Sequence, residues 1–193
     1  ATANQFLYCA VNDKRRVACW GNGRHGRLGF NLSSYHPRPI RVPNLGPVEE
    51  VAVGFQHSCA RLSGGTVRCW GEDGLDQRGS RVAFPAKTAP SVVHGLHNAQ
   101  TLTVGHQVSC ALKTDRTATC WGLLEEGRAD PPLGYSLINS GSPRWQKLDA
   151  GARSSCGIDD QGILSCWGNN DQGQLGDGTR ESRSEPAPVL GLR

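Results

Sequence analysis

Two cysteines separated by nine residues and followed directly by Trp-Gly recur four times in this chain of 193 residues. The first cysteines of successive pairs lie 50, 51 and 46 residues apart. A repeat of this length is typical of propellers and other arrays built from one supersecondary unit. We therefore expect a single domain of four similar modules, over about residues 1–47, 48–98, 99–145 and 146–193. The pairs are Cys9 and Cys19, Cys59 and Cys69, Cys110 and Cys120, and Cys156 and Cys166.

The residues between paired cysteines, such as "CARLSGGTVRC" and "CGIDDQGILSC", are typical of a strand, a tight turn and a second strand. Nine residues with a central turn place the cysteines opposite each other, about 4.5 Å apart at Cα in a non-hydrogen-bonded pair. Each pair is therefore expected to close its own hairpin with a disulfide. The alternatives are zinc, whose ligands are usually spaced by about two to four residues, and reduced cysteines, which do not explain one spacing kept four times.

A glycine stands five residues before the first cysteine in three modules, at Gly54, Gly105 and Gly151, and Asn4 takes its place in the first. Asparagine tolerates positive φ better than other non-glycine residues, so Asn4 is expected to meet the same backbone demand. Short β-prone segments precede these positions. A proline-bounded segment, such as "PRPIRVPNL", follows later in the module and suits an outer strand.

The composition agrees with a fold rich in turns, because the chain has 25 glycines and only 37% apolar residues. No run of eighteen apolar residues is present, and the first residues lack the pattern of a signal peptide. Methionine is absent even at position 1, so we expect a processed or excised chain that is soluble. Four disulfides would place it in an oxidising, extracellular compartment.

The segments "GFQHSCARLSGGTVRCWG" and "CWGNNDQGQLGDGT" resemble the repeat of the regulator of chromosome condensation family. The resemblance covers essentially the whole chain, is strongest in the second and fourth modules and is weakest after Trp121. It implies an all-β propeller of about four antiparallel blades, one per repeat. Most members close a ring of seven blades, so a closed ring of four, a fragment of a larger ring and an assembly with other chains are the possibilities. We expect the closed ring, because the chain starts and stops in the same repeat phase. The paired cysteines are similar to those of secreted bacterial members and of plant crinkly-type receptor ectodomains.

Residues that would support catalysis or metal binding do not converge in the sequence. His57 occupies the G-x-x-H-S position, where it is expected to pack and hydrogen-bond within its own blade. "DGLDQ" and "NNDQGQLGDG" lack the frame of a calcium loop and are expected to form Asx-turns. No nucleotide-binding or nucleophile motif is present, so we expect no enzyme activity, no cofactor and no metal.

The function expected is that of a secreted module that binds another protein through the loops at one end of the propeller, where the modules diverge most. A multivalent lectin and a protein inhibitor of a secreted enzyme are the alternatives; the family includes a secreted propeller that inhibits β-lactamases. We expect neither nucleic-acid binding nor membrane insertion, and an oligomer or larger assembly is possible. The candidate binding residues are Arg24, His25, Arg27, Asp76, Gln77, Arg78, Glu125, Glu126, Arg128, Tyr135 and Trp145.

Two further features concern the surface. Residues 1–47 hold seven Lys/Arg against one acid, whereas residues 146–193 hold five against seven. The basic first module either attracts an anionic partner or is a solvated face. Asn31 begins the sequon Asn-Leu-Ser and is a candidate glycosylation site.

Overall fold

The computed structural model describes residues 1–30, 34–74, 76–79, 88–122, 135–136 and 143–192. Within these parts the chain forms four antiparallel sheets of four strands, one sheet for each module. A short 3-10 helix, η1 (Arg24–Gly26), follows the third strand. None of the described helices is long and apolar enough to span a membrane. The prediction of an all-β fold with about four antiparallel blades is confirmed.

The strands follow one order in every sheet. The first sheet contains β1 (Thr2–Ala3), β2 (Leu7–Val11), β3 (Val17–Asn22) and β4 (Tyr35–Arg41). The second contains β5 (Val48–Val53), β6 (His57–Leu62), β7 (Val67–Gly71) and β8 (Ser91–Val92). The third contains β9 (Ala99–Val104), β10 (Val108–Lys113), β11 (Ala118–Gly122) and β12 (Tyr135–Ser136). The fourth contains β13 (Trp145–Ala150), β14 (Ser154–Asp159), β15 (Leu164–Gly168) and β16 (Arg183–Pro188).

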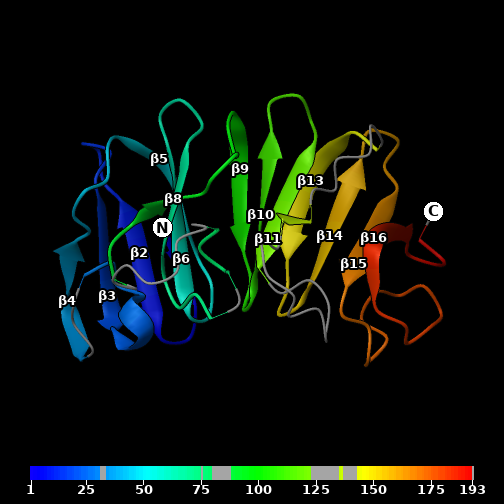
Figure 1. Ribbon diagram of the computed structural model, residues 1–193, viewed down its shortest axis with the longest axis horizontal. Helices are drawn as coiled ribbons and strands as arrows, with labels where there is room; N and C mark the ends of the chain where they lie inside the picture. The colour runs from blue at the N-terminus through cyan, green and yellow to red at the C-terminus, as the bar shows by residue number, and fades with distance from the viewer. Residues whose placement is uncertain (31–33, 75, 80–87, 123–134, 137–142, 193) are drawn as a thin grey trace.

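The four sheets stand side by side in chain order (Figure 1). Each packs against the next one along the chain, and the first and fourth sheets lie at opposite ends of the row. The expected closed ring of four blades is therefore wrong. The described part of the chain is therefore an open arc of blades (Figure 1).

The predicted disulfides are confirmed, and all four close hairpins. In each hairpin the two cysteines are direct partners across the second and third strands, as at Cys59 and Cys69. Their Cα atoms lie 4.0 to 4.1 Å apart. No free cysteine occurs in the part of the chain that the structure describes. The spacing of nine residues thus sets the strand register that brings each pair together.

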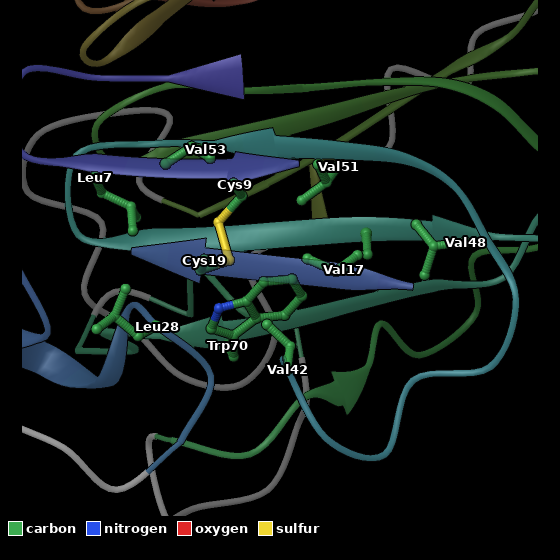
Figure 2. Packing of buried hydrophobic residues seen from close by; sticks show 11 residues of the cluster. Leu7, Cys9, Val17, Cys19, Leu28, Val42, Val48, Val51, Val53 and Trp70 are labelled. Atoms are coloured by element: carbon green, nitrogen blue, oxygen red, sulfur yellow. A yellow bond between two sulfur atoms is a disulfide. The ribbon is translucent and has the colours of Figure 1, made fainter. Parts of the chain in front are cut away.

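The hydrophobic core lies between neighbouring sheets, and each part of it joins a disulfide to a tryptophan of the next sheet. Figure 2 shows the first of these clusters, in which Trp70 of the second sheet packs below the Cys9–Cys19 disulfide of the first. Trp121 joins the disulfide of the second sheet, and Trp167 joins that of the third. All three indole rings are fully buried. These clusters therefore hold neighbouring sheets together.

The indole N–H groups of two tryptophans are paired across the same boundaries. Trp70 Nε1 donates to the carbonyl oxygen of Arg27 at 2.9 Å, and Trp121 Nε1 donates to that of Gln77 at 2.8 Å. Both acceptors stand eight residues after the second cysteine of the preceding module. A buried indole N–H needs a partner, so this loop carbonyl fixes how the next sheet docks.

The glycine of each Cys-Trp-Gly unit lets the chain leave its strand. Gly71 has φ of +106°, and a Cβ there would lie 2.6 Å from the carbonyl oxygen of Gln56. That same oxygen accepts a hydrogen bond from Glu72 N at 2.9 Å. Glycine is required here both by the backbone conformation and by the close approach of the neighbouring turn.

The glycines that precede the hairpins of the second and third sheets are required for a different reason from the one expected. Neither Gly54 nor Gly105 has positive φ, and neither does Asn4. A Cβ on Gly54 would instead collide with the carbonyl oxygen of Gly105 in the next sheet. Asn4 fits because its side-chain amide donates to the carbonyl oxygen of Gly54, which supplies a sheet-to-sheet bond in another way. Close approach between sheets, rather than positive φ, therefore explains Gly54 and Gly105, whereas a Cβ on Gly151 would meet only Ser154 of its own turn, at 3.4 Å.

Replacing Trp121 by alanine tests the core between sheets. We expect Trp121→Ala to lower the free energy of unfolding by about 3–5 kcal/mol, because it empties a buried site and removes the hydrogen bond from Trp121 Nε1 to the Gln77 carbonyl. Tyr35→Ala is the control, since Tyr35 is 69% exposed. Chemical denaturation followed by far-UV circular dichroism gives both values. Equal losses in the two variants would contradict this description.

Candidate functional site

Along one long edge of the row of sheets, which we call the loop rim, lie two kinds of connection between strands. The first is the short turn between the first and second strands, and the second is the long segment after the third strand. Backbone hydrogen bonds tie them together, as from Asn22 N to Phe6 O at 2.9 Å and from Asn169 N to Arg153 O at 3.0 Å. The opposite long edge, which we call the hairpin rim, carries the turns within the disulfide hairpins, such as residues 12–16.

A row of ring side chains crosses three sheets along the loop rim. Phe6 meets Phe55 edge to face with ring centroids 5.5 Å apart, and Phe55 meets His106 in the same manner at 4.4 Å. Phe6 is 41% exposed and the other two are half-buried. Sequence reasoning missed this row. A signal was present, since Phe55 and His106 both directly follow the glycine that precedes the hairpin.

Arg27 holds the aromatic row in place. Its guanidinium donates from Nη1 to the carbonyl oxygen of Phe55 at 2.9 Å and from Nε to that of Arg24 at 2.8 Å. The guanidinium carbon lies 5.9 Å from the centroid of the Phe6 ring. Burial, followed by repulsion from Arg24, lowers the pKa of Arg27 from its usual value. Its side chain is buried, so it supports the rim instead of presenting its charge to a partner.

Arg24 and His25 are exposed beside this row. His25 lies within the short helix η1 and has φ of +61°. Its Nδ1 lies 2.8 Å from Glu72 Oε2 and links the first sheet to the second. Of the binding residues expected in the first module, these two are exposed and Arg27 is buried.

The candidate binding residues of the second module are mostly buried and support the structure of their own loop. Gln77 and Arg78 are buried, and Asp76 is half-buried with φ of +56°. Arg78 forms an ion pair with Asp73, with Nη2 and Oδ2 2.7 Å apart. These contacts fix the loop against which Trp121 packs. The main role of this loop is therefore to hold the second and third sheets together.

The remaining candidates divide into two groups. Trp145, expected as an aromatic anchor, is buried and packs against Trp167 with ring centroids 5.4 Å apart. It opens β13 and so belongs to the fourth sheet. Tyr135 opens β12, where its backbone pairs with Trp121. Four further candidates lie outside the described residues: Asn31, Glu125, Glu126 and Arg128.

Comparison with protein families identifies the repeat. Two family models, both described as the regulator of chromosome condensation (RCC1) repeat, match residues 48–77 and 145–174, and residues 16–61 and 161–193. The chain belongs to the RCC1 repeat family. Each matched segment contains at least one of the cysteine-bearing hairpin strands described above, so the repeat seen in the structure is the repeat that the models describe.

Among curated relatives, the probable E3 ubiquitin-protein ligase HERC6 of Homo sapiens is 32% identical over 124 residues, which are 62% of this chain and 12% of that protein. Human WBSCR16 superposes with a TM-score of 0.82 at 20% identity, over 97% of this chain and 51% of that one. Yeast RCC1 (Prp20), solved bound to Kap60, gives 0.78 at 20% identity, over 96% and 47%. The crinkly ectodomain of the Arabidopsis thaliana receptor kinase ACR4 gives 0.52 at 22%, over 97% and 51%. The chain thus spans about half the length of these structures and a small part of HERC6.

His57, in the G-x-x-H-S position of the RCC1 repeat, joins two sheets. Its Nε2 lies 2.7 Å from Ser109 Oγ of the third sheet, which corrects the expectation of a bond within one blade. The side chain is fully buried. Burial, with a smaller effect from the nearby His106, lowers the pKa of His57 to about 3. The imidazole is therefore neutral at physiological pH and acts in packing.

The segment "NNDQGQLGDG" contains the predicted Asx-turn at Asp177, whereas "DGLDQ" includes Leu75, which lies outside the described residues. Asp177 Oδ1 accepts hydrogen bonds from Thr179 N at 3.0 Å and Thr179 Oγ1 at 2.7 Å. These bonds, and the nearby Arg183, lower the pKa of Asp177 to about 2. Among the described residues, no three His, Cys, Asp or Glu side chains are grouped as a metal site would require.

A concave groove of about 540 Å³ lies along the first strands of the sheets and is lined in part by acids. Glu49 forms an ion pair with Arg15 at 2.8 Å, and Glu50 with Arg61 at 3.1 Å. Asp149 accepts a hydrogen bond from Thr103 Oγ1 at 3.2 Å. The acids of this groove are thus paired within or between neighbouring sheets.

The depressed pKa of His57 predicts a dependence of stability on pH. The folded state binds fewer protons than the unfolded state between pH about 3 and 6.5, so stability falls as the pH falls through this window. We expect the free energy of unfolding to be about 3 kcal/mol smaller at pH 4 than at pH 7 from this group alone. His57→Gln should lose that part of the slope, and denaturation at both pH values measures it. An unchanged slope in the variant would contradict the assignment.

Proposed function

We propose that this chain is a secreted, non-enzymatic module that binds another protein through its loop rim. The aromatic row of Phe6, Phe55 and His106 carries the proposal. Aromatic and arginine side chains are enriched at the centres of protein interfaces, and this row has the partly exposed Phe6 at one end and Arg24 beside it. The contacts of Arg27 hold the row rigid before any partner arrives, which reduces the entropy lost on binding.

The charges beside the aromatic row favour a partner with acidic groups. Arg24 is exposed, and Arg153 at the far end of the rim bonds Gln107 Oε1 through its Nε at 2.7 Å. The excess of basic residues in the first module has the same sign. An acidic protein surface would therefore be steered toward the loop rim.

An extracellular location is supported by the hairpin disulfides, because such bonds persist in oxidising compartments and are rare in the cytosol. The yeast RCC1 structure with Kap60 concerns a propeller that binds a protein partner. That relative supports protein binding as the kind of activity, while the disulfides support a different compartment.

Sugar binding is less well supported. A multivalent lectin needs an exposed aromatic platform that recurs from blade to blade. The aligned tryptophans of the second, third and fourth sheets are fully buried, and the aromatic row ends at His106. A glycan array is the direct comparison. Binding to glycans together with no captured protein would favour the lectin over the proposed function.

Substitutions of exposed residues on the two rims test the proposed function. Arg24→Glu and Phe6→Ala should each weaken capture of the partner from the extracellular fluid of the source organism by about tenfold or more. Lys14→Glu is the matched control, since Lys14 is exposed on the hairpin rim of the same sheet. Quantitative mass spectrometry of the captured proteins gives the comparison. Equal capture by all four proteins, or equal loss with Lys14→Glu, would contradict binding at the loop rim.

A further inference from the structure

The turns between the first and second strands of the four sheets are joined to one another along the loop rim. Phe55 N donates to the carbonyl oxygen of Gly105 in the next turn at 3.3 Å. His106 N donates to that of Gly151 in the turn after it at 3.2 Å. At the first boundary the side-chain amide of Asn4 takes this role. The turns, which we call the rim ribbon, are residues 4–6, 54–56, 105–107 and 151–153.

The rim ribbon carries the aromatic row on three successive turns, because Phe6, Phe55 and His106 each belong to one of them. Burial, followed by repulsion from Arg153, lowers the pKa of His106 from its ordinary value. The His106 ring is therefore neutral at physiological pH and continues the uncharged surface of the two phenylalanines. The hydrogen bonds between turns hold this aromatic surface in one conformation before a ligand binds.

Arginines lie at both ends of the aromatic row. Arg24 is exposed next to Phe6, and its carbonyl oxygen accepts the hydrogen bond from Arg27 that lies over the Phe6 ring. At the other end, Arg153 is half-buried beside His106. An arginine guanidinium binds carboxylates through two parallel hydrogen bonds, which makes each end of the row suited to an acidic side chain.

Two acids of the neighbouring loop already have basic partners within the chain. Glu72 Oε2 lies 2.8 Å from His25 Nδ1, and Asp73 Oδ2 lies 2.7 Å from Arg78 Nη2. These contacts occupy the two carboxylates inside the second sheet and at its boundary with the first. The positive charge at the ends of the row is thus left to act on a ligand.

The row has the length of a short extended segment. Its ring centroids are 5.5 and 4.4 Å apart, and an extended chain advances about 3.3 Å per residue, so the three rings face about three residues. Building on the proposed function, we propose that the rim ribbon binds an extended segment of the partner protein in which acidic residues flank an apolar or aromatic side chain. The apolar side chain lies on the rings of Phe6 and Phe55, and the acids meet Arg24 and Arg153.

Selection from a library of random short peptides, displayed on phage and offered to the oxidised chain, tests this proposal without a known partner. We expect enrichment of peptides with Asp or Glu on both sides of an aromatic or large aliphatic residue. Phe6→Ala and Arg24→Glu should each weaken binding of an enriched peptide by about tenfold or more in calorimetry. Lys14→Glu is the matched control on the hairpin rim and should bind as the wild type does. Circular dichroism checks that each variant is folded.

Nuclear magnetic resonance locates the bound peptide. The amide signals of Phe55 and His106 should shift on binding, whereas those of the hairpin turns, such as residues 12–16, should stay in place. Enriched peptides that lack acids, or that bind the folded Phe6→Ala chain as tightly as the wild type, would overturn the inference.

The extended segment and the proposed function can fail separately. Partner capture that depends on Phe6 and Arg24, together with a selection that enriches no acidic peptide, would overturn the extended segment and leave protein binding at the loop rim. If neither capture nor peptide binding depends on these two residues, both proposals are wrong.

Discussion

The structure depends on the burial of one tryptophan against the disulfide of the preceding sheet. A sheet of four short strands has too little apolar surface to form a core alone, and the chain is only 37% apolar. The disulfide fixes the hairpin register and supplies a compact apolar surface, and the next tryptophan covers it. At two of the three boundaries the indole N–H also pairs with a loop carbonyl of the same neighbour. Stability is thus placed at the boundaries between sheets, as in other repeat arrays.

This arrangement separates packing from recognition. Arg27, Gln77 and Arg78 lie in loops that look suited to binding, but they are buried because their backbone or side chains receive the next sheet. The surface left for a partner is the outer layer of the loop rim, where Phe6 and Arg24 are exposed.

Much of this fold could be predicted from the sequence. The spacing of Cys59 and Cys69 fixes the register of one hairpin, and the same spacing recurs in the other three modules. The open arc could not be predicted, since closure depends on the angle between sheets, which no local pattern contains. Gly54 illustrates a further limit: the sequence shows that a small residue is needed, but the carbonyl that forbids a Cβ comes from the next sheet. The candidate binding residues could be named from the sequence, but only the structure divides them into buried and exposed side chains. The aromatic row needed three-dimensional contacts to be seen.

A double-mutant cycle between a disulfide and a tryptophan tests the central claim most directly. Replacing Cys59 and Cys69 by alanine, Trp121 by alanine, and then all three gives the coupling between the disulfide and the tryptophan that packs on it. We predict a coupling of about 1–3 kcal/mol in the free energy of unfolding. The same disulfide paired with Trp167, which packs on the disulfide of the third sheet, should give additive losses. Additive losses in both cycles would contradict the account.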